Sequence, residues 1–157
     1  MARIVQKFGG TSVGSVERIK AVAQKVKATV EDGHEVAVVV SAMSGTTNQL
    51  VTWAKECGAF HDAREYDTVV ATGEQVTIGL LAIALQDIGV DARSWLGWQI
   101  PIHTDDAHGA ARIETIDTTK ISERMAKGQV AVVAGFQGIG PDHRITTLGR
   151  GGSDTSA

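Results

Sequence analysis

The segment from residue 149 to residue 154 combines groups that bind an anion. Three glycines and one arginine are followed by two residues that can cap a helix: Gly149, Arg150, Gly151, Gly152, Ser153 and Asp154. Glycines let backbone N–H groups approach a ligand, and a serine or aspartate accepts hydrogen bonds at the first turn of a helix. A cation and free N–H groups therefore meet where a helix should begin, which predicts an anion site.

Three more polar segments follow expected strands or begin an expected helix: residues 7–12, 41–48 and 73–74. In open α/β sheets, ligands bind at the carboxyl edge of the parallel strands. If all four segments share that edge, they bring together two cations and two carboxylates: Lys7, Arg150, Glu74 and Asp154. Phosphoryl transfer needs this combination, because the protein must position phosphates and neutralise the charge on the transferred group.

The apolar pattern predicts the elements that carry the first two segments. Residues 4–8 form a short apolar strand, and residues 36–40 are β-branched and apolar without alternation, as in a strand covered on both faces. Between them, apolar residues recur at helical spacing from residue 16, with Ser15 as the expected N-cap and a stop at residues 32–33. This order predicts a βαβ unit with a buried parallel sheet.

The rest of the chain continues the alternation of helices and strands. Helices are expected at residues 49–55, at residues 62–71, from residue 76 to Gly89, and from a cap at Thr118 to residues 127–128. Strands are expected at residues 91–96, 100–104, 112–116 and 129–136. The last of these reads as a central strand, and a turn at residues 138–142 predicts a hairpin with residues 144–148. No domain boundary is expected before Ala157.

Composition excludes several classes of protein. The 157 residues carry a net charge of -3 with 21% charged residues, which gives no basic footprint for nucleic acid. The single cysteine, Cys57, excludes an internal disulfide framework. No apolar run approaches the roughly 20 residues of a membrane span, and the N-terminus has no signal-peptide core. We expect a soluble cytoplasmic protein without membrane or nucleic-acid partners.

Common catalytic signatures do not occur. The sequence contains neither G-x-x-x-x-G-K-[ST] nor G-x-G-x-x-G, which argues against a P-loop enzyme and a plain dinucleotide-binding fold. The five histidines have no metal-ligand spacing, so we expect no protein-held metal and interpret them as surface residues. Trp95, Trp98 and Met125 are interpreted as packing residues of the core or an interface.

Four segments in this order resemble the motifs of the aspartate kinases in the amino acid kinase family. They are Lys7-Phe8-Gly9-Gly10-Thr11-Ser12, Val40-Ser41-Ala42-Met43-Ser44-Gly45-Thr46-Thr47, Thr72-Gly73-Glu74 and Leu148-Gly149-Arg150-Gly151-Gly152-Ser153-Asp154-Thr155. The resemblance runs from residue 3 to the end. It implies an α/β fold, a three-layer αβα sandwich with a mainly parallel sheet, and transfer of the γ-phosphoryl group of ATP to the β-carboxylate of L-aspartate. The product, 4-phospho-L-aspartate, starts lysine, threonine and methionine biosynthesis.

The resemblance also assigns roles to single residues. On the nucleotide side it implies that Lys7 contacts the ATP phosphates, that Gly9 and Gly10 allow close backbone approach, and that Phe8 and Ser41 lie beside them. Mg²⁺ would be held mainly by phosphates and water. On the amino acid side it implies that Glu74 pairs the substrate ammonium, that Arg150 holds the α-carboxylate, and that Thr47, Gly151, Gly152 and Ser153 line the pocket. Asp154 would orient Lys7.

The same resemblance sets expectations about the extent of the chain. Residues 1–157 would be the N-terminal portion of a catalytic domain, without the nucleotide-binding half and the regulatory ACT domains of aspartate kinases. We then expect this portion to be inactive by itself and the protein to form a homo-oligomer.

Two other functions stay open from the sequence. A related kinase could act on another acid, such as acetylglutamate or glutamate, and the chain could be a non-catalytic binding or oligomerisation module. Taken singly, the polar residues also have ordinary explanations: Lys7 as a solvated lysine at a strand end, Glu74 as an acid in the first turn of a helix, and Asp154 as a helix cap.

Overall fold

A parallel four-stranded sheet forms the centre of the molecule. The computed structural model describes residues 1–149 and 151–157, so the predicted role of Arg150 lies outside the described residues. The sheet has the order β1 (Arg3–Phe8), β2 (Glu35–Val40), β6 (Val130–Ala134) and β3 (Ala92–Trp95), and all three strand pairs are parallel. The predicted βαβ unit and the central position of β6 are confirmed.

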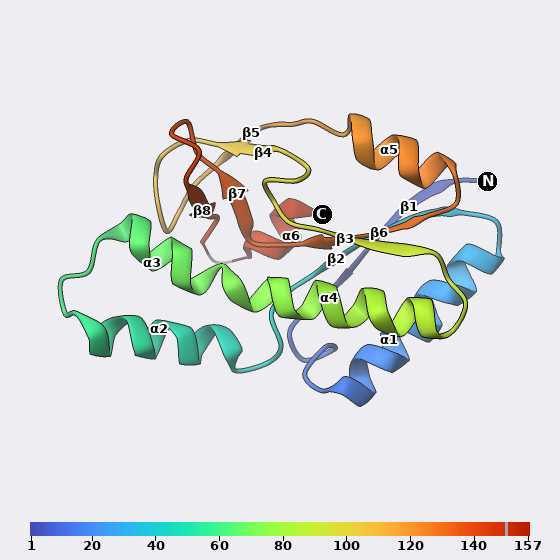
Figure 1. The fold of residues 1–157 in the computed structure, drawn as a ribbon, viewed down its shortest axis with the longest axis horizontal. Helices are drawn as coiled ribbons and strands as arrows, with labels where there is room; N and C mark the ends of the chain where they lie inside the picture. The colour runs from blue at the N-terminus through green and yellow to red at the C-terminus, as the bar shows by residue number, and fades with distance from the viewer. Residues whose placement is uncertain (150) are drawn as a thin grey trace.

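Helices cover both faces of this sheet (Figure 1). On one face, α1 (Val16–Glu31) and α4 (Thr72–Asp87) pack together, and on the other lies α5 (Thr119–Ala126). Alternate residues of β2 point to opposite sides: Val38 and Val40 join the core under α1 and α4, whereas Val39 packs towards α5. The result is three layers, and the α/β fold class is confirmed.

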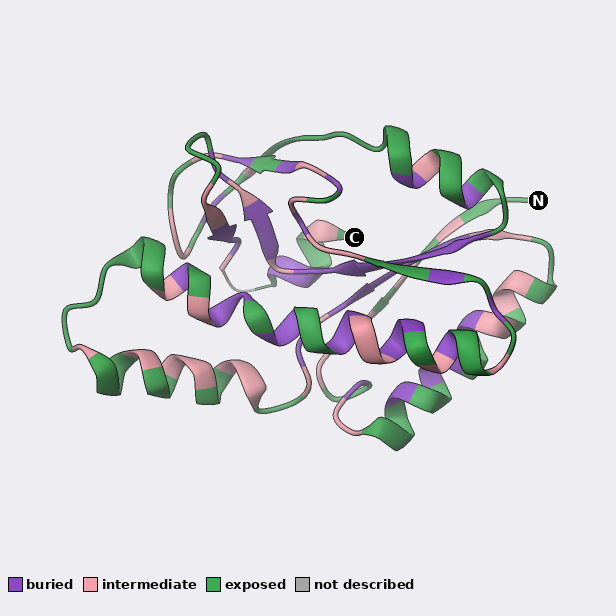
Figure 2. Cartoon of the chain, viewed as in Figure 1, coloured by how far each residue is buried: buried purple, intermediate pink, exposed green. Residues whose placement is uncertain are grey.

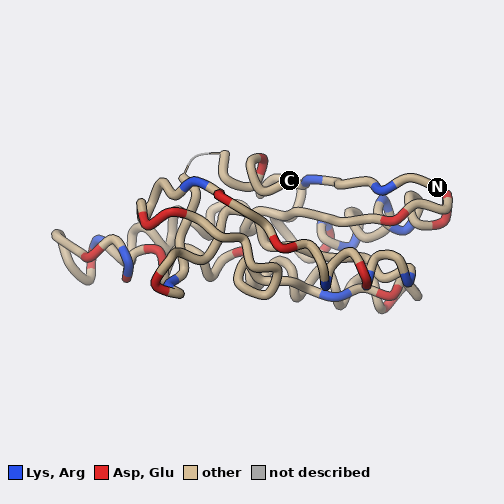
Figure 3. Tube along the Cα trace, turned by 90° about the horizontal axis from the view of Figure 1, so that it is seen from above, with Lys and Arg blue, Asp and Glu red and all other residues tan. Residues whose placement is uncertain are grey.

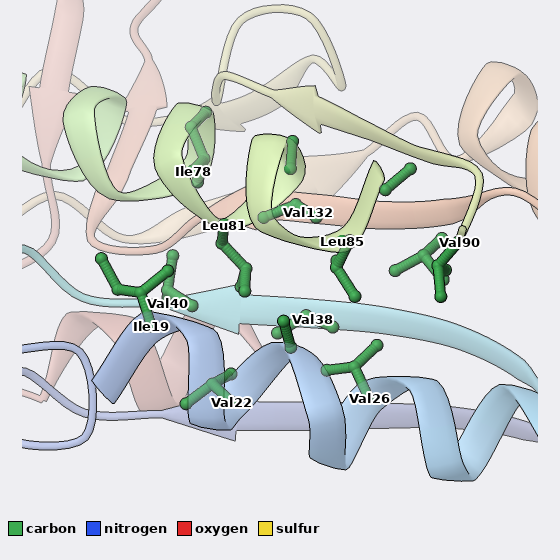
Figure 4. Close-up of a cluster of buried hydrophobic side chains, with 14 of the residues drawn as sticks. Ile19, Val22, Val26, Val38, Val40, Ile78, Leu81, Leu85, Val90 and Val132 are labelled. Atoms are coloured by element: carbon green, nitrogen blue, oxygen red, sulfur yellow. The ribbon is translucent and has the colours of Figure 1, made fainter. Parts of the chain in front are cut away.

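The larger of the two cores lies between α1, α4 and the sheet (Figure 4). Ile19 and Val26 of α1 form one cluster with Leu81 and Leu85 of α4 and with Val38 of β2. All five side chains are almost fully buried. Each side chain of this size contributes about 1.5–3 kcal/mol when it is removed from water. This core fixes the sheet that carries the polar segments, and Figure 2 shows buried residues concentrated along it.

A second, mixed sheet lies beside the first and was not anticipated from the sequence. Its order is β5 (Ile113–Ile116), β4 (Ile102–Thr104), β7 (Gln137–Ile139) and β8 (Ile145–Thr147). Strands β7 and β8 form the predicted hairpin, whereas β4 pairs with β7 in parallel at one position. The chain therefore changes sheets between β6 and β7, at Gly135 and Phe136.

Three helices lie near the ends of these sheets. The pair α2 (Thr46–Cys57) and α3 (Ala63–Val70) pack on each other, and α3 also contacts β8. The last helix, α6 (Gly152–Ser156), contacts β2. Figure 1 shows α3 leading directly into α4, with Ala71 between them.

Local signals located the helix ends well in some places and not in others. Ser15 Oγ accepts a hydrogen bond from Arg18 N at 3.2 Å, and Gly33 follows α1 with a φ of 89°, as predicted. Thr118 occupies the predicted N-cap position of α5, but its side chain accepts no capping hydrogen bond; the Asp117 carboxylate accepts a bond from Thr119 N instead. Helix α2 begins at Thr46 rather than at residue 49.

The start of α4 was predicted too late. The helix begins at Thr72 rather than at residue 76, so Gly73 and Glu74 lie in its first turn and not in a preceding loop. Gly73 packs so closely on Ala42 that a Cβ added to it would come within 2.7 Å of the alanine Cβ. A glycine, which normally argues against a helix, is required here for close packing.

Charge and hydropathy add two observations. Figure 3 shows acidic and basic residues interspersed along the trace. The combined stretch Ala63–Asp87, made of α3 and α4, is long and apolar enough to cross a membrane, but half of its most apolar window is buried inside the molecule. Since α4 belongs to the core, this is weak evidence for a membrane span.

Candidate functional site

A cavity of about 200 Å³ lies at the carboxyl ends of β1 and β2, beside α4 and α6. Eight of the residues that were assigned roles from the sequence line it: Lys7, Ser41, Thr47, Glu74, Gly151, Gly152, Ser153 and Asp154. Among the described residues, Phe136 and Gly149 also line it. The four polar segments therefore contribute to one cavity.

Strand register brings these segments to the same level. Phe8 lies opposite Val40, and Val40 lies opposite Ala134. The next residues continue the ladder, because Ser41 N donates to Phe8 O at 3.2 Å and Gly135 N donates to Val40 O at 3.0 Å. The ends of three parallel strands are thus aligned at the cavity.

Lys7 and Asp154 form an ion pair at the cavity wall. Lys7 Nζ lies 2.7 Å from Asp154 Oδ1, and the side chains are 30% and 70% exposed. An ion pair this open to water contributes about 0–1 kcal/mol to stability. The pair places the lysine ammonium at the cavity wall.

Glu74 supplies the buried negative group of the cavity. The residue is 2% exposed, and Oε1 accepts a hydrogen bond from Ala42 N at 3.1 Å. Oε2 is buried without a hydrogen-bond partner in the described part of the chain. Burial raises the pKa of the Glu74 carboxyl from 4.5 to about 7, because desolvation disfavours the charged form. A cation that enters the cavity would restore the charge and occupy the free oxygen.

Ser41 and Ser153 join β2 to α6. Their hydroxyl oxygens lie 2.8 Å apart. Ser153 also packs on Gly135, where an added Cβ would lie 2.7 Å from Ser153 Oγ and 3.0 Å from its Cα. Real Cβ atoms almost never lie closer than 3.0 Å to another heavy atom, so the absence of a side chain at Gly135 allows α6 to lie against the sheet.

Gly9 and Gly10 follow β1, and Thr47 lies in the helix that follows β2. Thr47 lies in the first turn of α2, just after Gly45, which has a φ of 84°. A Cβ on Gly10 would come within 3.0 Å of Ala42 O, so the segment after β1 lies close to the one after β2. Gly10 O also accepts a hydrogen bond from Ser44 N at 3.2 Å.

Three predicted residues do not line the cavity itself. Phe8, Gly9 and Gly10 follow Lys7 directly but are absent from its wall. The nearest approach is at Gly9, where an added Cβ would lie 3.5 Å from Lys7 Nζ. These residues therefore lie next to Lys7 but outside the cavity wall.

Phe136 lines the cavity and was not predicted as a site residue, whereas Gly149 belongs to the predicted anion segment but was given no role of its own. Phe136 has a φ of 73°, an unusual value for a residue with a side chain, and its N–H donates to Ser156 Oγ at 3.1 Å. Its ring packs against Gly152, where a Cβ would come within 2.9 Å of Phe136 Cδ2. The available signal was its position directly after a strand at the same edge as Lys7 and Ser41.

The interpretation of all five histidines as surface residues was wrong for His108. Its side chain is 7% exposed, and Nδ1 lies 2.8 Å from Oδ2 of the fully buried Asp67. The pair lies behind β8, outside the cavity wall. A lone histidine between turn residues carries no sequence signal for burial.

The groups present can bind a zwitterion next to an anion. Glu74 offers an unpaired carboxylate oxygen, Lys7 offers an ammonium, and Ser153 and Thr47 add hydroxyls. Among residues 1–149 and 151–157, no three His, Cys, Asp or Glu side chains form a metal site.

Comparisons with known proteins agree with this arrangement. Aspartokinase 2 of Bacillus subtilis is 55% identical over 157 residues, which cover 100% of this chain and 38% of that protein. The crystal structure of aspartate kinase from Synechocystis matches with a TM-score of 0.82 and 49% identity, over 98% of this chain and 25% of the other. Aspartokinase III of E. coli, solved with aspartate and ADP, shares the fold with a TM-score of 0.84 at 24% identity, over 98% of this chain and 45% of the other.

The chain thus spans 38% of the length of the first of these relatives. The model of the amino acid kinase family matches residues 2–157, which is nearly the whole sequence. With the fold and the cavity described above, this match establishes that the chain belongs to the amino acid kinase family.

Proposed function

We propose that the protein takes part in phosphoryl transfer from MgATP to the β-carboxylate of L-aspartate, giving 4-phospho-L-aspartate. One observation carries the proposal: a single cavity is lined by Glu74, whose Oε2 has no hydrogen-bond partner in the described part of the chain, and by the cationic side chain of Lys7. The names of its relatives, aspartokinase and aspartate kinase, support the choice of reaction.

The amino acid is proposed to bind through its two charged ends. The substrate ammonium pairs with Glu74, whose Oε2 has no other partner in the described part of the chain. At about 4 Å and an effective dielectric near 20, such a pair contributes roughly 4 kcal/mol before desolvation. Arg150 binds the α-carboxylate, a role that rests on the sequence motif, while Thr47, Gly151, Gly152 and Ser153 line the pocket.

The phosphates are proposed to lie between Lys7 and the backbone that follows it. Lys7 neutralises charge on the γ-phosphoryl oxygens, and Asp154, 2.7 Å away, orients its ammonium. Gly9 and Gly10 allow the chain to approach the phosphates, with Phe8 and Ser41 on either side. Mg²⁺ would be held mainly by the phosphates of the nucleotide and by water, and would neutralise part of their charge.

The reaction needs no general base. The attacking group is the substrate β-carboxylate, whose reference pKa near 3.9 leaves it ionised at neutral pH. A carboxylate oxygen attacks the γ-phosphorus, the bond to the bridging oxygen breaks, and ADP leaves. The protein contributes position and charge, which are the main requirements of phosphoryl transfer.

The remaining properties are proposed from the family resemblance. Because this chain spans 38% of the length of a curated relative, we propose that it is the N-terminal portion of a catalytic domain and holds the amino acid subsite. Further parts of a complete enzyme would bind adenosine and regulatory effectors. We also propose a soluble cytoplasmic homo-oligomer that serves lysine, threonine and methionine biosynthesis.

Ligand-dependent thermal unfolding tests the substrate. Aspartate at 100 times its dissociation constant stabilises the protein by about 2.7 kcal/mol, so the melting temperature must rise. Glutamate and acetylglutamate at the same concentration should give clearly smaller shifts. Equal shifts for all three acids, or none for aspartate, would argue against an aspartate site.

A hydroxamate assay with aspartate and MgATP tests turnover separately. We propose that residues 1–157 alone bind aspartate but form little aspartyl hydroxamate. Robust hydroxamate formation by these residues would overturn that part of the proposal and would place the complete catalytic machinery within them.

A further inference from the structure

A buried carboxylate outside the cavity makes contacts that the proposed mechanism does not use. Asp67, in α3, is 0% exposed. Its Oδ1 accepts a hydrogen bond from Thr147 Oγ1 at 2.6 Å, and its Oδ2 accepts bonds from Thr147 N and Gly109 N at 3.1 Å each. The fourth partner is His108 Nδ1, at 2.8 Å from Oδ2. Since a carboxylate is the acceptor, Nδ1 carries the proton.

Such a network is costly unless every contact is made. A buried carboxylate loses its hydration, and removal of one partner leaves a polar group without compensation. Well-packed apolar side chains often stabilise a protein as much as a buried charged network does. The network is therefore better explained by the position that it enforces than by stability.

The groups that Asp67 binds lie on two segments that meet at the cavity. Thr147 is the last residue of β8, and its carbonyl accepts a hydrogen bond from Ala111 N at 2.9 Å. Two residues later, Gly149 has a φ of 81° and packs on the other segment: an added Cβ would lie 3.3 Å from Gly109 O. Gly149 lines the cavity, and its carbonyl accepts the bond from Gly152 N at 3.1 Å.

We infer that Asp67, His108 and Thr147 are positioning residues for the cavity wall formed by Gly149, Gly151 and Gly152. Asp67 accepts hydrogen bonds from Thr147, at the end of β8, and from Gly109, in the turn on which Gly149 packs. One side chain therefore sets the distance between the end of β8 and this turn. The inference extends to aspartate binding, and in that part it rests on the proposed function.

Hydrogen exchange of the free protein tests the positioning without any ligand. Asp67→Asn removes the charge, and Thr147→Val removes the hydroxyl donor while keeping the side-chain shape. Matched controls are Asp106→Asn, an exposed residue in the same turn region, and Thr68→Val, on the exposed side of α3. The second variant keeps the test usable if the first does not fold.

We expect amide exchange in residues 147–149, 151 and 152 to rise by about tenfold or more in both test variants, because a lost buried partner costs roughly 1.4 kcal/mol or more. Amides of β2 and β6 should keep their protection, and the controls should match the parent protein. An unchanged rate in these five residues, or an equal rise throughout the molecule, would overturn the inference.

Calorimetric titration then separates this inference from the proposed function. We expect the dissociation constant for aspartate to rise by about tenfold in Thr147→Val, while the dissociation constant for a nucleoside triphosphate changes less than twofold. Equal weakening of both ligands would overturn selective positioning. If the parent protein does not bind aspartate, the proposed function fails, and the exchange result still decides whether Asp67 positions the wall.

Discussion

The ammonium of Lys7, near the end of the first strand, lies 2.7 Å from the carboxylate of Asp154 in the last helix. The pair joins the two ends of the chain across the cavity. It is too exposed to contribute much to stability, so its expected effects are on phosphoryl transfer.

Lys7→Ala should lower phosphoryl transfer in the complete enzyme by about 10²–10³, because one group that stabilises developing charge is lost. Lys7→Arg should recover only part of the rate, since the guanidinium differs in shape. The measurement is kcat with saturating aspartate and MgATP. Lys27→Ala is the control, because Lys27 forms an exposed pair with Glu31 on α1. Equal effects of Lys7→Ala and Lys27→Ala would contradict the assigned role.

Asp154→Asn should show whether Asp154 orients the Lys7 ammonium or stabilises the folded protein. We expect a clear loss of kcat with a change in unfolding free energy below about 1 kcal/mol, because the Asp154 side chain is 70% exposed. Urea unfolding and steady-state kinetics on the same preparation measure both quantities. A large loss of stability without loss of rate would assign Asp154 a structural role.

Glu74 should make stability depend on pH. Its pKa is about 7 in the folded protein and near 4.5 when unfolded, so the folded state binds more protons between these values. The stability that the protonated carboxyl provides is complete below pH 4.5 and is lost as pH rises through 7, by on the order of 3 kcal/mol. Urea unfolding of the parent protein and of Glu74→Gln at pH 5 and pH 8 measures it. A pH-independent difference between the two proteins would refute this assignment.

Aspartate binding should have the opposite pH dependence. The ammonium pairs with ionised Glu74, so binding near pH 7 should release a proton and should weaken as pH falls from 8 to 6. Titration calorimetry in two buffers of different ionisation enthalpy counts the released protons. Glu74→Gln should bind aspartate at least about tenfold more weakly and release none from this site. Proton release that persists in Glu74→Gln would point to another group.

Gly135→Ala should disturb α6. The new Cβ would lie 2.7 Å from Ser153 Oγ and 3.0 Å from its Cα, so the helix must move, at a cost of about 1–3 kcal/mol. Aspartate affinity should fall with it. Gly79→Ala is the matched control: it lies within α4 with open space around its Cα, and it should stabilise the protein by up to about 1 kcal/mol. Equal melting temperatures for the two variants would disprove the close packing.

Much of the fold follows from local sequence patterns. The unbroken apolar runs in β2 and β6 predict strands covered on both faces, and Ser15 and Gly33 define the ends of α1. The polar residues after these strands reach one cavity because parallel strands end at a common edge. Lys7, Ser41 and Asp154 were therefore predictable as neighbours.

Other features depend on contacts that no local pattern encodes. The glycine at position 73 favoured a prediction that α4 begins after it. Gly73 instead packs on Ala42 within the first turn of α4, so Glu74 also lies in that turn. The burial of His108 depends on Asp67 in a distant helix. Phe136, with its positive φ, lies where the chain passes from one sheet to the other.

The aligned ends of β1, β2 and β6 also constrain how this sequence can vary in length. Phe8, Val40 and Ala134 lie at one level, so the spacing of Lys7, Ser41 and Phe136 is set by backbone hydrogen bonds inside an apolar sheet. Inserting or deleting a single residue in β2 would turn every following side chain to the opposite face. Volume-conserving exchanges among the buried valines leave this spacing intact, so the interior tolerates changes of composition far better than changes of length.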